Sequence, residues 1–373
     1  MNNKIFKNIA LASMMLMLFC SCSNNHNLDI VTSLSPDKLY TQAIHLKGDR
    51  LQEELYADGY FKGFFTPDGF LGSLRADNGK LIHLLSINTA EIQQSEGAKG
   101  RGPKELLMPY SVDYVPESGT LFLEDIVRSK IVSFRLDTGH ISIVNSTDLT
   151  QRDKGCVIEN MQAISDSLFV IRVNDIAPPY SCYLAIVNSR NETLDSLQIY
   201  QLDNDNIEHS KIRNIDATIR LSPNRKNLIV CNAKYNHLTN YSLVGNKFNQ
   251  VNKKFILEPK VSIRDGKIKR DPLHLQWESE VFTSANYIYV VSNPETRGDY
   301  LKRLKDYEEK GERMGELTDN SYILVFDYNF NFIKSYKCDD HFHWITIAPD
   351  EKTVYASTYL DGCYLTKYVL EGL

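Results

Sequence analysis

The feature that most constrains the fold is a strand–turn–strand pattern that recurs six times along the chain. In its clearest copy, the apolar run 344–348 is followed by the turn residues Pro349-Asp350 and by two further β-rich runs. Turn residues of this kind between β-rich runs predict hairpins. The copies begin about 47 to 64 residues apart, near Phe64, Ser111, Met161, Ala217, Glu280 and Trp344. Because such a period is typical of propeller blades, the sequence predicts an all-β, six-bladed β-propeller.

The last copy has room for only three strands. Near the start of the chain, the run 42–46 (Gln-Ala-Ile-His-Leu) alternates enough to form a strand. We expect it to supply the missing outer strand of the last blade, which would close the ring and cover an exposed sheet edge.

One segment of the fifth copy breaks the pattern. Residues Thr296 to Asp319 are highly charged. Four apolar or aromatic residues in this segment recur at helical spacing: Tyr300, Leu301, Leu304 and Tyr307. This spacing predicts a short amphipathic helix inserted between strands of the fifth blade. The helix is interpreted either as a solvent-exposed insertion without a binding role or as a docking element.

The N-terminus has the composition of a processing signal. Lys4 and Lys7 precede the apolar run 9–19, and the small residue Ser21 stands directly before Cys22. This arrangement resembles a bacterial lipoprotein signal with Cys22 as the lipidated residue. The alternative is an ordinary secretory signal that is cut nearby. The predicted organisation is a signal peptide at 1–21, a polar tether at 22–39 and the propeller at 40–373.

A glycine-rich loop, 97–106, separates the first two blades. It carries the basic residues Lys99, Arg101 and Lys104 among three glycines and a proline. One interpretation is a basic rim, with Glu105, that binds an anionic or glycan ligand. The other is a crossing between blades whose charges are merely solvated. The spacing does not fit a phosphate-binding loop.

Part of this loop also carries a family resemblance. Gly100, Gly102, Pro103 and Glu105 form a Gly-x-Gly-Pro-x-Glu element, and over roughly residues 40–371 the chain resembles the TolB-like six-bladed β-propeller lipoproteins. The resemblance implies the fold and an envelope address, a lipid-anchored protein of a Gram-negative-type bacterium. In such lipoproteins an acidic run after the lipidated cysteine can direct export to the surface. No such run follows Cys22, which favours the periplasmic face.

Some six-bladed propellers are hydrolases that bind calcium in the central channel. Asp113, Asp216 and Glu280 lie near the starts of predicted inner strands and could converge there. The alternative is that these residues line a wet channel. A second set of metal-type residues is Asp339-Asp340-His341-Phe-His343, in which the two histidines would share one face of a strand.

The formal net charge of −5 means that the chain has no overall excess of basic residues, which argues against a nucleic-acid partner. No motif of a nucleophile or a zinc enzyme is present in the sequence. We therefore expect a monomeric, non-catalytic binding or scaffold module without a cofactor. Its partner would be an envelope protein, a peptide or a glycan, and it would meet the membrane only through its lipid. The alternative is a lactonase-like hydrolase or lyase with a divalent cation.

Overall fold

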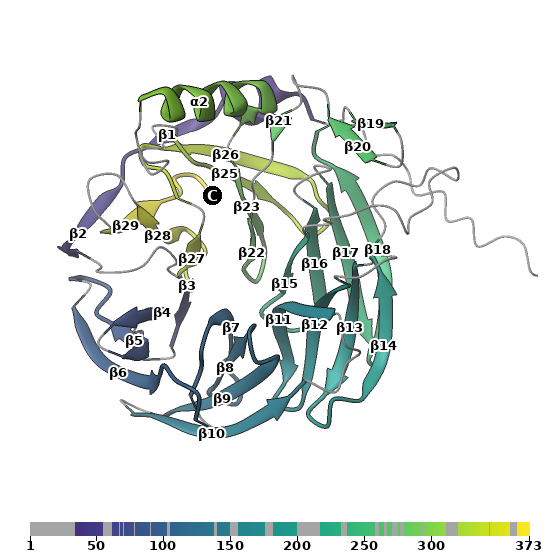
Figure 1. The fold of residues 1–373 in the computed structure, drawn as a ribbon. Coiled ribbons are helices and arrows are strands. Elements are labelled where there is room, and N and C mark those ends of the chain that lie inside the picture. The colour runs from purple at the N-terminus through teal and green to yellow at the C-terminus, as the bar shows by residue number, and fades with distance from the viewer. Residues whose placement is uncertain are drawn as a thin grey trace, which may run out of the picture. The chain divides into compact units, whose positions relative to one another are not determined.

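Five four-stranded sheets and one five-stranded sheet surround a common axis in the computed structural model of the chain (Figure 1). The chain divides between Val31 and Thr32, and every described residue belongs to the second unit. The structure describes residues 34–54, 62–66, 68–69, 71–77, 79–89, 91–102, 105–137, 140–149, 156–175, 182–199, 217–232, 237–257, 261–264, 267–270, 275–276, 280–292, 294–310, 320–342, 344–358 and 364–373.

Each sheet is one blade, with its first strand nearest the axis. Blade 1 contains β3 (Lys62–Phe65), β4 (Leu71–Asp77), β5 (Lys80–Leu85) and β6 (Ile92–Ala98). Blade 2 contains β7 (Pro109–Val115), β8 (Thr120–Asp125), β9 (Lys130–Asp137) and β10 (His140–Asp148). Blade 3 contains β11 (Cys156–Ser165), β12 (Leu168–Asp175), β13 (Cys182–Asn188) and β14 (Thr193–Gln198).

The second half of the chain forms the other three blades. Blade 4 contains β15 (Ala217–Leu221), β16 (Asn227–Asn232), β17 (His237–Val244) and β18 (Lys247–Phe255). Blade 5 contains β22 (Glu280–Thr283), β23 (Ile288–Ser292), β25 (Tyr322–Phe326), β26 (Phe332–Cys338) and the added β1 (Ile44–Leu46). Blade 6 contains β27 (Ile345–Ile347), β28 (Thr353–Thr358), β29 (Tyr364–Val369) and β2 (Asp49–Glu54).

The remaining elements lie outside the blades. They are η1 (Asp37–Thr41), the hairpin β19 (Val261–Arg264) with β20 (Lys267–Arg270), the pair β21 (Leu275–Gln276) with β24 (Glu295–Thr296), and α2 (Arg297–Lys310).

The six-bladed propeller that the sequence predicts is confirmed. All six sequence copies begin at or beside an innermost strand, and each innermost strand contacts the innermost strands of both neighbouring blades. The helix predicted in blade 5 is also confirmed, because α2 lies between β23 and β25. None of the described helices has the length and apolar composition needed to cross a membrane.

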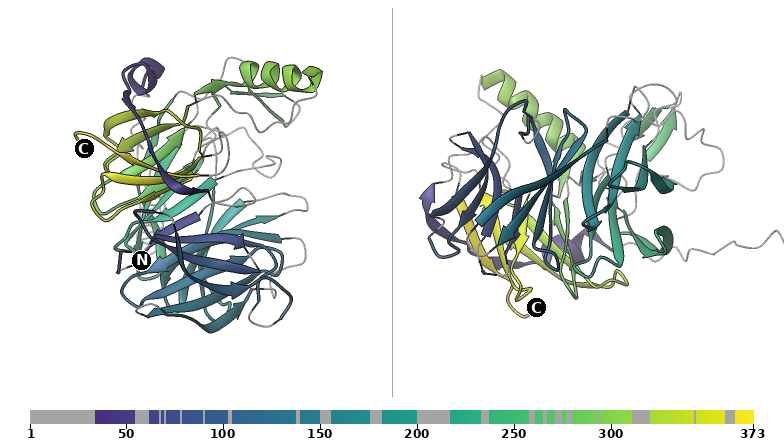
Figure 2. Two further views of the ribbon diagram at one scale, coloured as in Figure 1. Left: turned by 90° about the vertical axis from the view of Figure 1, so that its left-hand side faces the viewer. Right: turned by 90° about the horizontal axis from the view of Figure 1, so that it is seen from below.

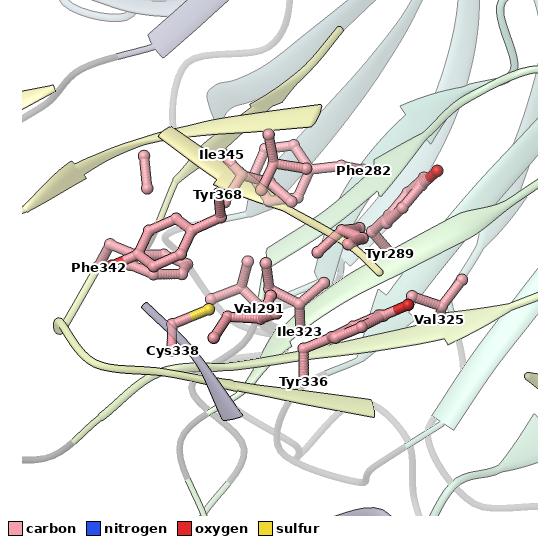
Figure 3. Packing of buried hydrophobic residues seen from close by; sticks show 14 of the residues in the cluster. Phe282, Tyr289, Val291, Ile323, Val325, Tyr336, Cys338, Phe342, Ile345 and Tyr368 are labelled. Carbon is pink, nitrogen blue, oxygen red and sulfur yellow. The ribbon is translucent and has the colours of Figure 1, made fainter. Parts of the chain in front are cut away.

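The hydrophobic core lies between the blades. The second strand of a blade is covered on both sides, so β8 and β23 are buried at every position, including the charged residues Glu124 and Asp125 of β8. One cluster between blades 5 and 6 contains Tyr289, Tyr336 and Tyr368, all fully buried, together with Phe342 (Figure 3). Similar clusters fill the other spaces between neighbouring blades, so each blade is held by apolar contacts with two others.

Ring closure occurs, but the strand that closes the ring is not the predicted one. The run 42–46 overlaps β1, which pairs in parallel with β26 of blade 5, whereas β2 completes blade 6 by pairing with β29. The prediction that 42–46 forms the outer strand of the last blade is therefore wrong, because the next strand along the chain, β2, takes that place. β2 reads Asp-Arg-Leu-Gln-Glu-Glu, and such a charged sequence on an outer strand gives no apolar alternation that could reveal it.

Polar contacts fix the start of this closing strand. The backbone N–H of Gly48 donates to Asp339 at 3.1 Å, and Arg50 pairs with Asp340 at 3.1 Å. The buried Tyr368 hydroxyl donates to Asp339 at 3.0 Å and to Asp340 at 3.4 Å. We call these five residues the latch. Two aspartates of the predicted metal cluster, Asp339 and Asp340, thus hold β2. His341 lies in the connection between β26 and β27 rather than on a strand. His343 lies outside the described residues.

The two faces of the ring differ in their loops. On one face, which we call the hairpin face, turns join the first strand of a blade to the second and, in blades 1 to 5, the third to the fourth. On the opposite crossing face lie the connections between blades, including residues 99–106, and the insertion with α2. Seen edge-on, α2 projects from one face of the ring (Figure 2).

Candidate functional site

A cavity of about 600 Å³ lies on the propeller axis and is lined by residues of all six innermost strands or their turns. We call it the axial cavity. It extends to the turns of the hairpin face, where Pro116, Pro223 and Pro349 line it. Its walls are largely apolar and include Phe64, Phe65, Val112, Leu221, Phe282, Ile345 and Ile347. Polar and charged side chains such as Lys62, Gln162 and Arg220 also line it.

Lys62 reaches the axis from the first residue of β3. Its ammonium donates to the backbone carbonyl of Tyr110 and lies 4.0 Å from the Tyr110 ring centroid and 4.3 Å from that of Trp344. Burial lowers the pKa of Lys62 to about 8, and the field of Arg220 adds to the shift while Glu280 opposes it. The ammonium is thus stabilised by two aromatic faces where water has been removed.

Arg220 reaches the same indole from blade 4. Alternation along β15 turns Arg220 away from the space between blades, where Ile219 and Leu221 are buried. Its guanidinium carbon lies 5.3 Å from the ring centroids of both Phe282 and Trp344. The two rings meet edge to face with their centroids 5.8 Å apart.

Two glutamates, the buried Glu124 and the partly buried Glu280, balance these cations. Glu124 of β8 is fully buried and accepts hydrogen bonds from the Ser111 hydroxyl and the Met161 N–H, but its Oε1 atom has no hydrogen-bond partner in the described part of the chain. Burial raises the pKa of Glu124 to about 7, although Ser111 and Lys62 act against the shift. Burial also raises the pKa of Glu280, against the fields of Arg220 and Lys62.

Other inner residues tie the blades together. Arg225, in the first turn of blade 4, donates to Asp113 at 2.6 Å, to the Ala163 carbonyl at 3.2 Å and to the Tyr114 carbonyl. It therefore spans blades 2, 3 and 4 at the mouth of the cavity. Arg225 adopts a φ of 58°, which is costly for a residue with a side chain. The contacts across blades offset this cost and fix the shape of the mouth.

The predicted calcium residues are only partly within the described structure. Asp113 accepts hydrogen bonds from Arg225 and from the Ala163 N–H at 2.7 Å, and Glu280 lies among cations. Asp216 lies outside the described residues. Among the described residues, no group of three or more His, Cys, Asp or Glu side chains could hold a metal ion. The protein's own cations balance both described carboxylates, which reduces the charge available to calcium. The calcium site stays a prediction.

The glycine-rich loop has a clear local structure. Glu105 accepts a hydrogen bond from the Gly102 N–H at 2.6 Å, and a Cβ atom at Gly100 would lie 2.1 Å from the Glu105 carboxylate. Arg128 donates to the carbonyls of Gly102 and Glu105 at 2.9 and 3.0 Å. The Gly-x-Gly element thus makes room for a carboxylate that closes the turn, and Glu105 is occupied within the loop.

The basic side chains of this loop are only partly described. Lys99 and Arg101 are exposed on the crossing face, and Lys104 and Pro103 lie outside the described residues. Cys22 also lies outside them. The basic rim stays a prediction. It is on the face opposite the hairpin turns that line the axial cavity.

The cluster around Trp344 was not predicted from the sequence. The sequence does not single out Lys62, Arg220 or Glu124. It offers Trp344 as a stacking surface for sugars or, by default, as a residue packed between blades, and Trp344 does belong to the cluster between blades 5 and 6. One available signal was a charged residue inside an apolar inner strand, as in Ala-Thr-Ile-Arg220-Leu. In a propeller, the alternate face of such a strand points to the axis, so its charges mark the channel.

Comparison with known proteins agrees with this architecture. The family described as TolB-like 6-blade propeller-like matches residues 68–350. The solved structure of a DUF4221 family member from Bacteroides vulgatus is similar, with 12% identity, a TM-score of 0.57, and coverage of 88% of this chain and 96% of that one. A Bacteroides fragilis protein described as exported is similar, with 11% identity, a TM-score of 0.51, and coverage of 90% and 97%. No curated protein sequence matches the chain.

Proposed function

Because the chain belongs to the TolB-like six-bladed propeller family, we propose that it is a non-catalytic binding module that takes its ligand into the axial cavity. The ligand would be a small molecule or part of an envelope protein, peptide or glycan. The protein would act by recognition, holding the ligand between fixed aromatic and charged side chains.

One observation carries this proposal. The axial cavity has the volume of a typical small-molecule site, about 600 Å³, and combines apolar walls with a few convergent polar groups. Hydrogen bonds between blades, such as Thr283 to the Leu221 carbonyl at 2.6 Å and the Leu221 N–H to Gln162 at 3.1 Å, hold its walls. A wall fixed in this way loses little conformational entropy when a ligand binds.

The proposed address is the cell envelope, with the chain anchored through lipid on Cys22 and facing the periplasm. The lipoprotein-type signal before Cys22 supports it, and so does the similarity to a protein described as exported. Replacing Cys22 by Ser is expected to abolish incorporation of labelled fatty acid and to release the protein from membranes. Unchanged labelling would contradict the anchor.

The fluorescence of Trp344 tests whether the cavity binds ligands. The chain has two tryptophans, so Trp277→Phe leaves Trp344 as the sole reporter. We expect saturable changes of its emission with at least one of three probes: N-acetylphenylalanine, its amide, and N-acetylglucosamine. Ala348 lines the cavity near its mouth, so Ala348→Phe should weaken binding at least tenfold by filling space.

The matched control adds the same bulk at an exposed position. Val127 is 61% exposed on the crossing face, and Val127→Phe should leave binding unchanged. If none of the probes changes Trp344 emission, or if Ala348→Phe binds as the parent does, the axial cavity is not the binding site.

A further inference from the structure

The guanidinium group of Arg220 lines the axial cavity without a hydrogen bond to the described part of the chain. Arg220 lies against Phe282 and Trp344, with its guanidinium carbon 5.3 Å from both ring centroids. Among the described residues, none forms a hydrogen bond or an ion pair within 4.0 Å with Arg220, although the field of Glu280 acts on it. Burial lowers the pKa of Arg220, because removing the charged guanidinium from water costs free energy. An anionic ligand beside it could offset this cost.

The other described arginines near the axis use both terminal nitrogens in hydrogen bonds, although the Nε atom of each has no partner among the described residues. Arg172 donates to the Ala217 carbonyl and pairs with Glu159. Arg225 donates to Asp113 and to two backbone carbonyls. These two residues show how the propeller satisfies a structural arginine. Arg220 departs from that pattern and lines the cavity.

A second cation lies beside the first. Lys62 also lines the cavity, and its ammonium is 4.3 Å from the Trp344 ring that Arg220 contacts. Glu124 and Glu280, which balance these cations, are not among the residues that line the cavity. Two other carboxylates do line the cavity, but Asp113 pairs with Arg225 and Glu351 accepts hydrogen bonds from Asn286. The positive charges of Arg220 and Lys62 are therefore the ones left to attract a ligand.

We propose that the axial cavity binds a carboxylate on an apolar body, with the Arg220 guanidinium donating to the carboxylate and Lys62 adding positive charge. This inference rests on the proposed binding function and specifies its ligand class. A planar carboxylate fits the paired N–H donors of a guanidinium. The apolar body would extend toward the hairpin face along Phe65, Val112 and Ile347. Both a free organic acid and a peptide C-terminus offer this chemistry.

The test compares acids with their uncharged amides by calorimetry, using the full chain in a non-ionic detergent at pH 7. N-acetylphenylalanine should bind at least thirtyfold more tightly than its amide. Arg220→Gln should remove this preference by weakening the acid at least thirtyfold while the affinity for the amide stays within threefold. Arg220→Lys, which keeps the charge but not the planar donor pair, should restore only part of the loss.

The matched control removes one positive charge from the crossing face. Arg101 is exposed there, and Arg101→Gln should leave the acid's affinity unchanged. The tripeptide Ac-Ala-Ala-Phe with a free C-terminus identifies the source of the carboxylate. Affinity equal to or above that of N-acetylphenylalanine indicates a peptide C-terminus, and affinity tenfold lower indicates a free acid.

Three results would overturn the inference. If the parent protein binds the acid and the amide with equal affinity, the cavity binds ligands but does not select carboxylates. This comparison needs no variant. If phenyl phosphate binds more tightly than N-acetylphenylalanine, the two cations recognise a phosphate group and not a carboxylate. Loss of acid binding in Arg101→Gln but not in Arg220→Gln would place the site at the glycine-rich loop and would contradict the proposed function as well.

Discussion

Replacing Asp339 and Asp340 together by alanine is expected to destabilise the propeller by roughly 3 to 5 kcal/mol, because their removal leaves buried polar partners unsatisfied. The double change leaves Tyr368, which is fully buried, without its two carboxylate acceptors. It also removes the ion pair of Arg50 and the acceptor for the Gly48 N–H. Since these contacts fix the start of the closing strand, β2 should separate from β29 before the rest of the ring opens.

Denaturant unfolding measures the loss, and hydrogen exchange identifies the strand that is released. The amides of β2 and β29 should lose most of their protection in the double variant, while those of blade 3 should keep theirs. Asp137→Ala, at an exposed position on β9, is the control and should cost less than about 0.5 kcal/mol, as surface changes usually do. A double variant as stable as the parent would mean that the latch does not hold the ring closed.

Glu124→Gln is expected to change how stability depends on pH. The pKa of Glu124 in the folded protein is about 7, above the ordinary value of 4.5, because the carboxyl group is buried. The folded state therefore binds this proton more tightly than the unfolded state, and the associated stability is full below pH 4.5 and is lost as pH rises through 7. The loss amounts to roughly 3 kcal/mol. The glutamine side chain of the variant would keep a neutral acceptor at every pH.

Subtracting the free energy of unfolding of the parent from that of the variant cancels the contributions of the other titratable groups, which both proteins share. The free energy of unfolding of Glu124→Gln minus that of the parent should rise by roughly 3 kcal/mol between about pH 4.5 and 7.5. This range stays below the pKa of Lys62, about 8, so that the neighbouring ammonium remains charged. Glu117→Gln, at an exposed turn, should show no such rise. A constant difference for Glu124→Gln would show that the pKa of this carboxyl group is the same in the folded and unfolded states.

The sequence was sufficient for the blades because each inner strand and its turn are local features. Pro349-Asp350 illustrates this: Asp350 accepts hydrogen bonds from the N–H groups of Lys352 and Thr353, so a few consecutive residues specify the hairpin. The closing strand was not predictable in the same way. Its position depends on Asp339 and Asp340, far away in the sequence, and its own residues are mostly charged.

The site depends on contacts that no local pattern contains. Lys62, Arg220 and Trp344 come from blades 1, 4 and 6, and they meet only because the ring brings their inner strands to one axis. The glycine-rich loop, in contrast, was visible in the sequence because its chemistry is local. Its glycines make room for Glu105, which gives the motif a structural reason that needs no ligand.

The most direct test of the account is to locate a bound acid by methyl NMR of isoleucine-labelled protein. Ile345 and Ile347 line the axial cavity, whereas Ile92 and Ile333 are 40% and 43% exposed on outer strands. With N-acetylphenylalanine, the account predicts saturable shifts of the Ile345 and Ile347 methyl signals and none for Ile92 and Ile333. Saturable binding that leaves Ile345 and Ile347 unshifted would contradict it, because the ligand would then lie outside the axial cavity.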